Sequence, residues 1–495
     1  MNRPAFVVAV ALAALSAAAC WIVQRNGWTL YYGDAEAHLQ VARRMVDSRT
    51  PGYGQLGAVW LPLPHLLMLP LAANNTLWRT GLAGTIPSAI CFILGGTFLF
   101  AAARRAFASV AAGVVATAVF AFNPNVLYLQ ATPMTEPLFM ASLSALLYYS
   151  IRFAEMPSFA SAVGAGIASF AGALTRYDGW FLIPFVAAYL FLRTPKRRVR
   201  FALVYGAIAC LAPLLWIAHN VWWFGDPLDF YRGPYSAKAI YLRLGAYPGD
   251  HDWRKSFEYV WEAGRQCSGW ATAILGIAGI VAAVIKRVYW PLVLLALVPL
   301  FYVWAMYSSG NPIFVPNLPP HGYYNTRYGL CFVMLFAFAA AALVIVTPPP
   351  KRAVAAAVVT AVIAVFWLTR PNPDAWITWK ESEKNSVARR AWMSAAADYL
   401  RQHYRGGGIF TMLGDEAGIY REAGIPLRQA LTDGNEPQWM NAAARPDLFL
   451  HEKWAVAQAG DPVSKAMAKM GPAYTRVDTI AVPGAPAIEI YRKDP

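Results

Sequence analysis

The chain has 495 residues, of which 58% are hydrophobic and only 14% charged. Soluble proteins carry about a quarter charged residues, so this composition excludes an ordinary soluble protein and indicates a membrane protein. The net charge of +15 does not indicate nucleic-acid binding, because much of the excess lies in short loops between apolar runs.

Eleven apolar runs predict membrane-spanning helices. Each run approaches or exceeds the length that crosses a hydrocarbon core of ~30 Å. The first run begins like a signal peptide, but it is long enough to span and lacks a clear cleavage site, so we interpret it as a retained helix. The runs are 4–24, 81–103, 107–123, 135–154, 158–175, 179–193, 200–223, 267–285, 288–308, 327–347 and 353–369.

The charges of the loops predict the orientation. With a cytoplasmic N-terminus, every inside loop is short and basic, including 193–200 and 351–352. The run at 60–73 is short and holds three prolines, so we interpret it as interfacial or re-entrant. Counting it as a span would place the basic loops outside.

This topology gives two domains. Residues 1–369 form a transmembrane domain with outer loops 25–80 and 224–266, and residues 370–495 form a soluble outer domain. The tail contains a predicted amphipathic helix at 386–404 and strands at 409–413 and 487–493. The expected fold is an all-α polytopic membrane protein, with about 11 spans, followed by a small α/β domain.

The stretch GDAEAHL, residues 33–39, places two carboxylates and a histidine just beyond the first span. Asp34 fits a helix N-cap as well as a functional carboxylate, and the two roles are compatible. His38 lies four residues on, on the same helical face, and fits a hydrogen-bonding neighbour better than a metal ligand. Glu36 points elsewhere if the helix has begun.

Other ionisable residues gather at the outer ends of predicted spans. Glu136 begins one span, where the helix dipole alone could favour an acid. Acids beside a bilayer are costly, so we favour a functional role. Arg176 and Asp178 lie at another outer end and could pair with each other, or Arg176 could bind a lipid phosphate.

Arg327 begins a later span and is suited to clamp a phosphate, although snorkelling to headgroups would also explain it. Lys238 could add positive charge from the outer loop 224–266. Tyr324 is one of many aromatic residues at these ends; an aromatic belt explains most of them, and one or two could stack on a sugar. No Cys/His cluster predicts a metal site.

Several short motifs together resemble the GT-C glycosyltransferases, in particular the group of protein O-mannosyltransferases and lipid A aminoarabinose transferases. The motifs are an outer-loop Asp34 ahead of a helix ending in Ala42-Arg43, PLPHLLMLPL (62–71), TEPLF (135–139) and TRYDGW (175–180). The resemblance covers roughly residues 1–350. This sequence has Ala35 where the family often has Glu after the Asp, and Glu36 follows one place later.

The resemblance implies a membrane enzyme that moves a hexose or pentose from a polyprenyl-phosphate donor to a lipid, glycan or protein acceptor, with inversion. It implies Asp34 as general base, with Glu36 as the competing candidate, and Glu136 as the second acid. Arg327, Arg176 and Lys238 would bind the donor phosphate, with His38, Asp178 and Tyr324 in support. The resemblance identifies no cofactor that the reaction must have, and it leaves a role for a divalent metal open.

Other functions stay open at this point. A flippase or transporter of such lipids, a glycan polymerase or ligase, and a non-catalytic envelope scaffold would each fit a polytopic chain with an outer tail. The alanine-rich spans and compact loops favour a bacterial inner membrane. In that location the spans would contact membrane lipids, and the tail would be periplasmic. The sugar, the acceptor and the oligomeric state are not defined by the sequence.

Overall fold

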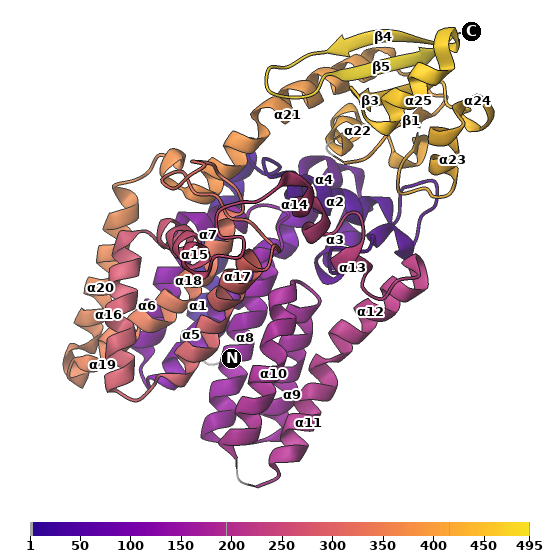
Figure 1. The fold of residues 1–495 in the computed structure, drawn as a ribbon. Helices are drawn as coiled ribbons and strands as arrows, with labels where there is room; N and C mark the ends of the chain where they lie inside the picture. The colour runs from indigo at the N-terminus through magenta and orange to yellow at the C-terminus, as the bar shows by residue number, and fades with distance from the viewer. Residues whose placement is uncertain (1–2, 195, 415, 495) are drawn as a thin grey trace. The chain divides into compact units, whose positions relative to one another are not determined.

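The fold of the chain is mostly helical, with one small sheet near the C-terminus (Figure 1). The computed structural model describes residues 3–194, 196–414 and 416–494. These residues divide into two compact units. Unit 1 comprises the described residues of 1–27, 58–64 and 86–381, and unit 2 comprises 28–57, 65–85 and the described residues from 382 onwards.

Unit 1 is built from helices. In chain order they are α1 (Arg3–Arg25), α5 (Leu82–Ala106), α6 (Val110–Ala121), α7 (Pro124–Leu129), α8 (Glu136–Glu155), α9 (Phe159–Ala173), α10 (Tyr177–Arg193), α11 (Arg198–Ala209), α12 (Leu211–Phe224), α13 (Asp229–Arg232), α14 (Ala237–Leu244), α15 (Trp253–Ser268), α16 (Trp270–Ile285), α17 (Trp290–Tyr307), η2 (Thr326–Gly329), α18 (Leu330–Ala340), α19 (Ala342–Val346), η3 (Pro349–Lys351), α20 (Arg352–Leu368) and η4 (Pro373–Ala375).

Each of the eleven predicted spans coincides with a helix or with consecutive helices. Within the described ranges, six helical segments are long and apolar enough to cross a membrane, or seven if the bent pair α15–α16 is one span. The polytopic helical fold is therefore confirmed, whereas the count of eleven stays a prediction. The six segments are Arg3–Arg25, Leu82–Ala106, Arg198–Phe224, Trp290–Tyr307, Thr326–Val346 and Pro349–Leu368.

Helix α18 lies at the centre of unit 1. All its residues are buried and all are apolar, as expected for a helix with neighbours on every side. Its neighbour α16 approaches closely because Gly279 has no side chain. A Cβ at this position would collide with the backbone of Ala339 in α18. A Cβ at Gly329 would likewise collide with the backbone of Ala263 in α15. The approach at Gly329 helps to position the turn that carries Arg327.

Unit 2 combines the first predicted outer loop with the tail. Its helices are α2 (Gly33–Arg44), η1 (Tyr53–Leu56), α3 (Leu63–Ala72), α4 (Asn75–Thr80), α21 (Ile377–His403), α22 (Ala417–Ala423), η5 (Leu427–Gln429), α23 (Gln438–Ala444), α24 (Pro446–Phe449), α25 (Pro462–Met470) and η6 (Gly471–Ala473); α3 and α21 start in unit 1. One apolar core joins Leu39, Met68 and Trp78 of the loop with Trp392 and Ile490 of the tail.

The strands of unit 2 form one mixed sheet in the order β2-β1-β3-β5-β4. Strand β1 runs parallel to β2 and to the central β3, and β5 runs antiparallel to β3 and β4. The strands are β1 (Ile409–Phe410), β2 (Ala430–Leu431), β3 (Trp454–Gln458), β4 (Tyr474–Ile480) and β5 (Ile488–Lys493). The small C-terminal sheet is as predicted, but the predicted strand 409–413 shortens to two residues.

Arg43, at the end of α2, ties the first loop together. Its Nη1 donates to the carbonyls of Ala72 and Ala73 at 2.8 and 3.0 Å, and its Nε donates to Asp47 at 2.9 Å. The guanidinium also lies 4.5 Å from the ring centre of Trp78. The arginine of the Ala42-Arg43 motif thus has a structural function in unit 2.

Candidate active site

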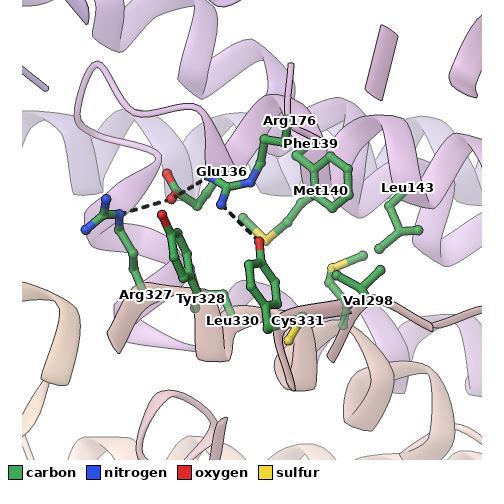
Figure 2. Close-up of a pocket in the computed structure, with 12 residues that line it drawn as sticks. Glu136, Phe139, Met140, Leu143, Arg176, Val298, Arg327, Tyr328, Leu330 and Cys331 are labelled. Atoms are coloured by element: carbon green, nitrogen blue, oxygen red, sulfur yellow. Dashed lines mark hydrogen bonds and ion pairs between the residues drawn. The ribbon is translucent and has the colours of Figure 1, made fainter. Parts of the chain in front are cut away.

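A buried ion cluster lies where three helical elements of unit 1 begin. Glu136 is the first residue of α8, Arg176 precedes α10, and Arg327 lies in η2. Glu136 Oε1 accepts hydrogen bonds from Arg176 Nη1 at 3.0 Å and from Arg327 Nε at 3.2 Å. Figure 2 shows both guanidinium groups directed at this carboxylate. Residues far apart in sequence therefore form one site.

Arg176 has further partners. Its Nη2 donates to the Tyr302 hydroxyl at 2.9 Å, and that hydroxyl donates to Asp178 Oδ2 at 2.7 Å. Nε of Arg176 lies 3.5 Å from Asp178 Oδ1, and Nη1 also donates to Thr135 Oγ1 at 3.0 Å. The expected pairing of Arg176 with Asp178 is present, with Tyr302 as a bridge.

Arg327 is held by Glu381 and by an aromatic ring. Glu381 Oε1 accepts from Arg327 Nη1 at 2.9 Å, and its oxygens accept from the backbone amides of Asn325 and Thr326 at 3.1 and 2.8 Å. Arg176 and Arg327 both lie over Tyr328, at 5.0 and 5.2 Å from its ring centre. Both guanidiniums are fixed before any ligand arrives.

The cluster lines a small cavity of about 20 Å³. This room is about enough for one water molecule. Figure 2 shows the charged groups toward one side of the cavity and Leu143 and Val298 toward the other. The second carboxylate oxygen, Glu136 Oε2, is buried without a hydrogen-bond partner in the described part of the chain. The hydrogen-bonding capacity of this oxygen is therefore unused among the described residues.

Lys238 and Tyr324 lie in segments of unit 1 that the loop charges predict to be outside the membrane. Lys238, on α14, donates to the Tyr231 hydroxyl at 2.9 Å and lies over the same ring. It forms no ion pair with a carboxylate of the described residues. The Tyr324 hydroxyl lies 2.8 Å from that of Tyr241, also on α14. Lys238 is thus a cation without a competing carboxylate, unlike the two arginines.

The residues Asp34, Glu36 and His38 belong to α2 in unit 2. The helix begins at Gly33 and its N-cap position is Tyr32, so Asp34 is not the N-cap. The half-buried Asp34 lies in the first turn, where the helix dipole favours a carboxylate. His38 Nδ1 lies 2.9 Å from His65 Nε2 in the buried interior.

Glu36 is buried in an ion pair with the tail. Its Oε1 accepts from Arg421 Nε at 2.8 Å and from Gln40 Nε2 at 3.0 Å. Burial raises the pKa of Glu36, but attraction and hydrogen bonding from Arg421 outweigh this, so the pKa lies below its usual value. Glu36 therefore holds its negative charge firmly.

The structure brings together Glu136, Arg176, Asp178 and Arg327 of the predicted site residues. Sequence reasoning missed Tyr302, Tyr328 and Glu381 in this cluster and Arg421 beside Glu36. Tyr328 directly follows Arg327 and could have been noticed, but the others meet their partners across more than 50 residues. Among the described residues, no group of three or more His, Cys, Asp or Glu side chains is arranged to hold a metal ion.

The fold defines a class of protein, the polytopic helical membrane proteins. The structure is similar to that of ArnT from Cupriavidus metallidurans bound to undecaprenyl phosphate, with a TM-score of 0.56 and 14% identity over 95% of this chain and 97% of that chain. An apo oligosaccharyltransferase from Archaeoglobus fulgidus has a TM-score of 0.48 and 14% identity, over 92% of this chain and 69% of its own.

Within that class, residues 75–223 match the family described as dolichyl-phosphate-mannose-protein mannosyltransferase. None of the curated proteins matches the chain significantly. The matched segment contains both TEPLF and TRYDGW, so the resemblance expected from these motifs is confirmed. The chain is a multi-pass membrane protein with a fold like that of the GT-C glycosyltransferases.

Proposed function

We propose that the protein is a glycosyltransferase that moves one sugar, a hexose or pentose, from a polyprenyl-phosphate donor to an acceptor hydroxyl with inversion. The observation that carries the proposal is the ion cluster: Glu136 of TEPLF meets Arg176 of TRYDGW and Arg327 in one buried site. The match of residues 75–223 and the fold shared with ArnT support the reaction class.

We assign the general base to Asp34. Glu36 is the competing carboxylate, but it is buried, bound to Arg421, and has a pKa below its usual value. A carboxylate held in this way is a weaker proton acceptor. Asp34 is half-buried in the first turn of a helix anchored by Arg43, which favours it as the base. Glu36 then orders the loop by binding the tail.

We assign Lys238 to the donor phosphate, together with Arg327 and Arg176. Lys238 can meet a phosphate without first breaking an ion pair. The arginines share Glu136 Oε1, so their role is to hold positive charge near the departing phosphate in fixed positions. Tyr324 joins the loop that carries Arg327 to the helix that carries Lys238.

The transfer step then balances in a simple way. Asp34 takes the proton of the acceptor hydroxyl, and the oxygen forms a bond to the anomeric carbon of the sugar. The bond from that carbon to the phosphate oxygen breaks, and its electron pair leaves with the polyprenyl phosphate. One displacement inverts the anomeric carbon, and the phosphate needs no proton to depart. The acceptor, whether lipid, glycan or protein, supplies only the hydroxyl.

We place the reaction at the periplasmic face of a bacterial inner membrane, with a cytoplasmic N-terminus. The basic short loops support this orientation. A polyprenyl phosphate cannot leave the bilayer, so the enzyme must meet its donor at the interface. Loops 25–80 and 224–266 and the tail would then share the face where Asp34 and Lys238 act.

The test is sugar transfer in proteoliposomes from a panel of labelled polyprenyl-phosphate sugars, with native membrane extract as acceptor. Asp34→Asn should abolish transfer by the folded protein, Glu36→Gln should mainly lower stability, and Glu258→Gln, an exposed carboxylate on α15, should change neither. Parallel assays with EDTA or added Mg²⁺ measure metal dependence. Full activity of Asp34→Asn would show that Asp34 is not the general base. Lipid flipping without sugar transfer by the wild type would favour a transporter.

A further inference from the structure

A second hollow in unit 1 is distinct from the ion cluster. It lies where α15 ends, α16 begins and α20 ends, beside the loop that contains Tyr323. Its volume is about 250 Å³, which is far larger than the cavity at Glu136. We call it the α16–α20 hollow. It has the room for a ligand group rather than for a single water.

Positive charge lines the α16–α20 hollow. Arg370 donates to the Phe366 carbonyl at 3.0 Å and stacks on the Phe366 ring at 4.0 Å. It forms no ion pair with any carboxylate in the described ranges. Arg265 is neutralised by Glu262, and the one carboxylate in the lining, Asp374, is bound to Lys380 at 2.5 Å. Arg370 is therefore an uncompensated cation at the hollow.

A buried donor in the lining lacks an acceptor. Trp367 is 8% exposed, and its indole N–H has no hydrogen-bond partner among the residues that the structure describes. Buried donors are almost always paired, so an orphan in a pocket wall indicates an acceptor from a ligand. Donors thus predominate in the hollow, which favours an anionic oxygen-rich group such as a phosphate.

Apolar surface extends from the hollow along both helices. On α16, Ile274 and Val281 are 62% and 55% exposed, and on α20, Val358 and Val365 are 56% and 58% exposed. Both helices are apolar, and they pack against each other (Figure 1). A ligand that binds here therefore meets cationic and N–H groups at one end and hydrocarbon surface along its length.

We propose that the α16–α20 hollow binds the phosphate of a membrane phospholipid. Arg370 and the Trp367 indole contact the phosphate oxygens, Trp270 and Tyr323 flank the headgroup, and the acyl chains follow the exposed faces of α16 and α20. This site is separate from the residues assigned to the donor phosphate, and the proposal does not depend on the transfer reaction.

The test measures binding of phosphatidylglycerol to the purified full-length protein by native mass spectrometry. Arg370→Gln should weaken binding about tenfold, since it removes a charged hydrogen-bond partner. Trp367→Phe keeps the ring and should weaken binding severalfold. Arg25→Gln is the matched control, because Arg25 ends α1 and lies 5.1 Å from the Trp21 ring centre but does not line the hollow. Its affinity should equal that of the wild type.

Four outcomes would overturn the proposal. Equal binding of diacylglycerol, which lacks phosphate, would show ordinary hydrocarbon contact. Full competition by inorganic phosphate would show a free-anion site, and displacement by equimolar undecaprenyl phosphate would assign the hollow to the donor lipid. Unchanged affinity of both Arg370→Gln and Trp367→Phe, in protein that unfolds at the wild-type temperature, would exclude the hollow itself.

Discussion

Glu381 binds the guanidinium of Arg327 at 2.9 Å across 54 residues of sequence. The same carboxylate accepts from the backbone amides of Asn325 and Thr326, so it sets the conformation of the turn as well as the position of the arginine. Arg327 in turn shares Glu136 with Arg176. The position of Glu381, near the start of α21, therefore affects the positions of Arg327, Glu136 and Arg176.

Glu381→Gln should impair transfer through Arg327. It removes a charge-assisted hydrogen bond worth about 1.5–3 kcal/mol, so we expect a loss of roughly 10- to 100-fold in kcat/KM. The measurement is single-sugar transfer by protein matched for its unfolding temperature. Glu155→Gln breaks a more exposed pair with Arg105 and should have little effect. Equal losses in the two variants would contradict the specific role of Glu381.

Lys238→Gln should raise the KM for the polyprenyl-phosphate donor by about tenfold, because it removes a cation free to bind phosphate. Unfolding temperature should hardly change, since the hydrogen-bond and ring partner of Lys238 in the described structure is the exposed Tyr231. The measurement is donor titration at two salt concentrations. A drop in kcat at an unchanged KM would instead place Lys238 outside donor binding.

Glu36→Gln should destabilise unit 2 by about 3 kcal/mol at pH 7, because it leaves Arg421 buried without its partner. The pKa of Glu36 is lower in the folded state than its unfolded value of about 4.3. Its stabilisation is therefore complete above that value and disappears as pH falls through the folded pKa.

The difference in unfolding temperature between wild type and Glu36→Gln should accordingly shrink from pH 7 to pH 3.5. The double variant Glu36→Gln, Arg421→Gln should lose less than the sum of the single losses. A difference that is constant with pH, or strict additivity, would show that the pair contributes little.

Glu416 should produce the opposite pH dependence. Burial raises its pKa well above the usual range, and repulsion from Asp461 adds to this, despite the hydrogen bond from Thr411 at 2.7 Å. A raised folded pKa means that stability is greatest at low pH and falls as pH rises from about 4.3 through the folded pKa.

The Glu416→Gln variant should not lose stability in this way. Its unfolding temperature relative to that of the wild type should therefore rise as pH increases from 5 to 8. Thermal unfolding at both pH values measures this gain. Asp447→Asn, at an exposed pair with Arg445, is the control and should show no such trend. A wild type that is equally stable at both pH values would contradict the raised pKa.

The tail should not fold by itself. Residues 382–494 share one apolar core with Leu39, Met68 and Trp78 of the first loop, and a tail fragment would expose its side of that core. We expect the isolated fragment to be protease-sensitive and to lack a cooperative unfolding transition. Cooperative unfolding of the fragment would support an independent domain from residue 370, as the sequence suggested.

The spans were predictable because their apolar runs have no alternative to a helix in hydrocarbon. The run before Thr347 became the fully buried α18, and AIEIYRK became β5 with little change. By contrast, loop 224–266 contains α13, α14 and most of α15, which no run of apolar residues revealed. Short amphipathic helices carry a weaker sequence signal than spans do.

The site was partly predictable for a different reason. Glu136 and Arg176 stand out because charge is rare beside a bilayer. Glu381 and Arg421 lie in charged stretches typical of soluble proteins, WKESEK and YREAG. Nothing in these stretches distinguishes the functional acid or base from its charged neighbours. Their partners are fixed only by tertiary folding, across 54 and 385 residues.

The separation of Glu36 and Arg421 in the sequence also determines when their ion pair can form during synthesis. The ribosome makes Glu36 385 residues before Arg421, an interval of about 20 to 80 s at ordinary elongation rates. When the first loop leaves the ribosome, its ion partner and most of its apolar core do not yet exist. In a newly made chain the first loop therefore stays accessible to proteases until β5, the last strand, has been translated.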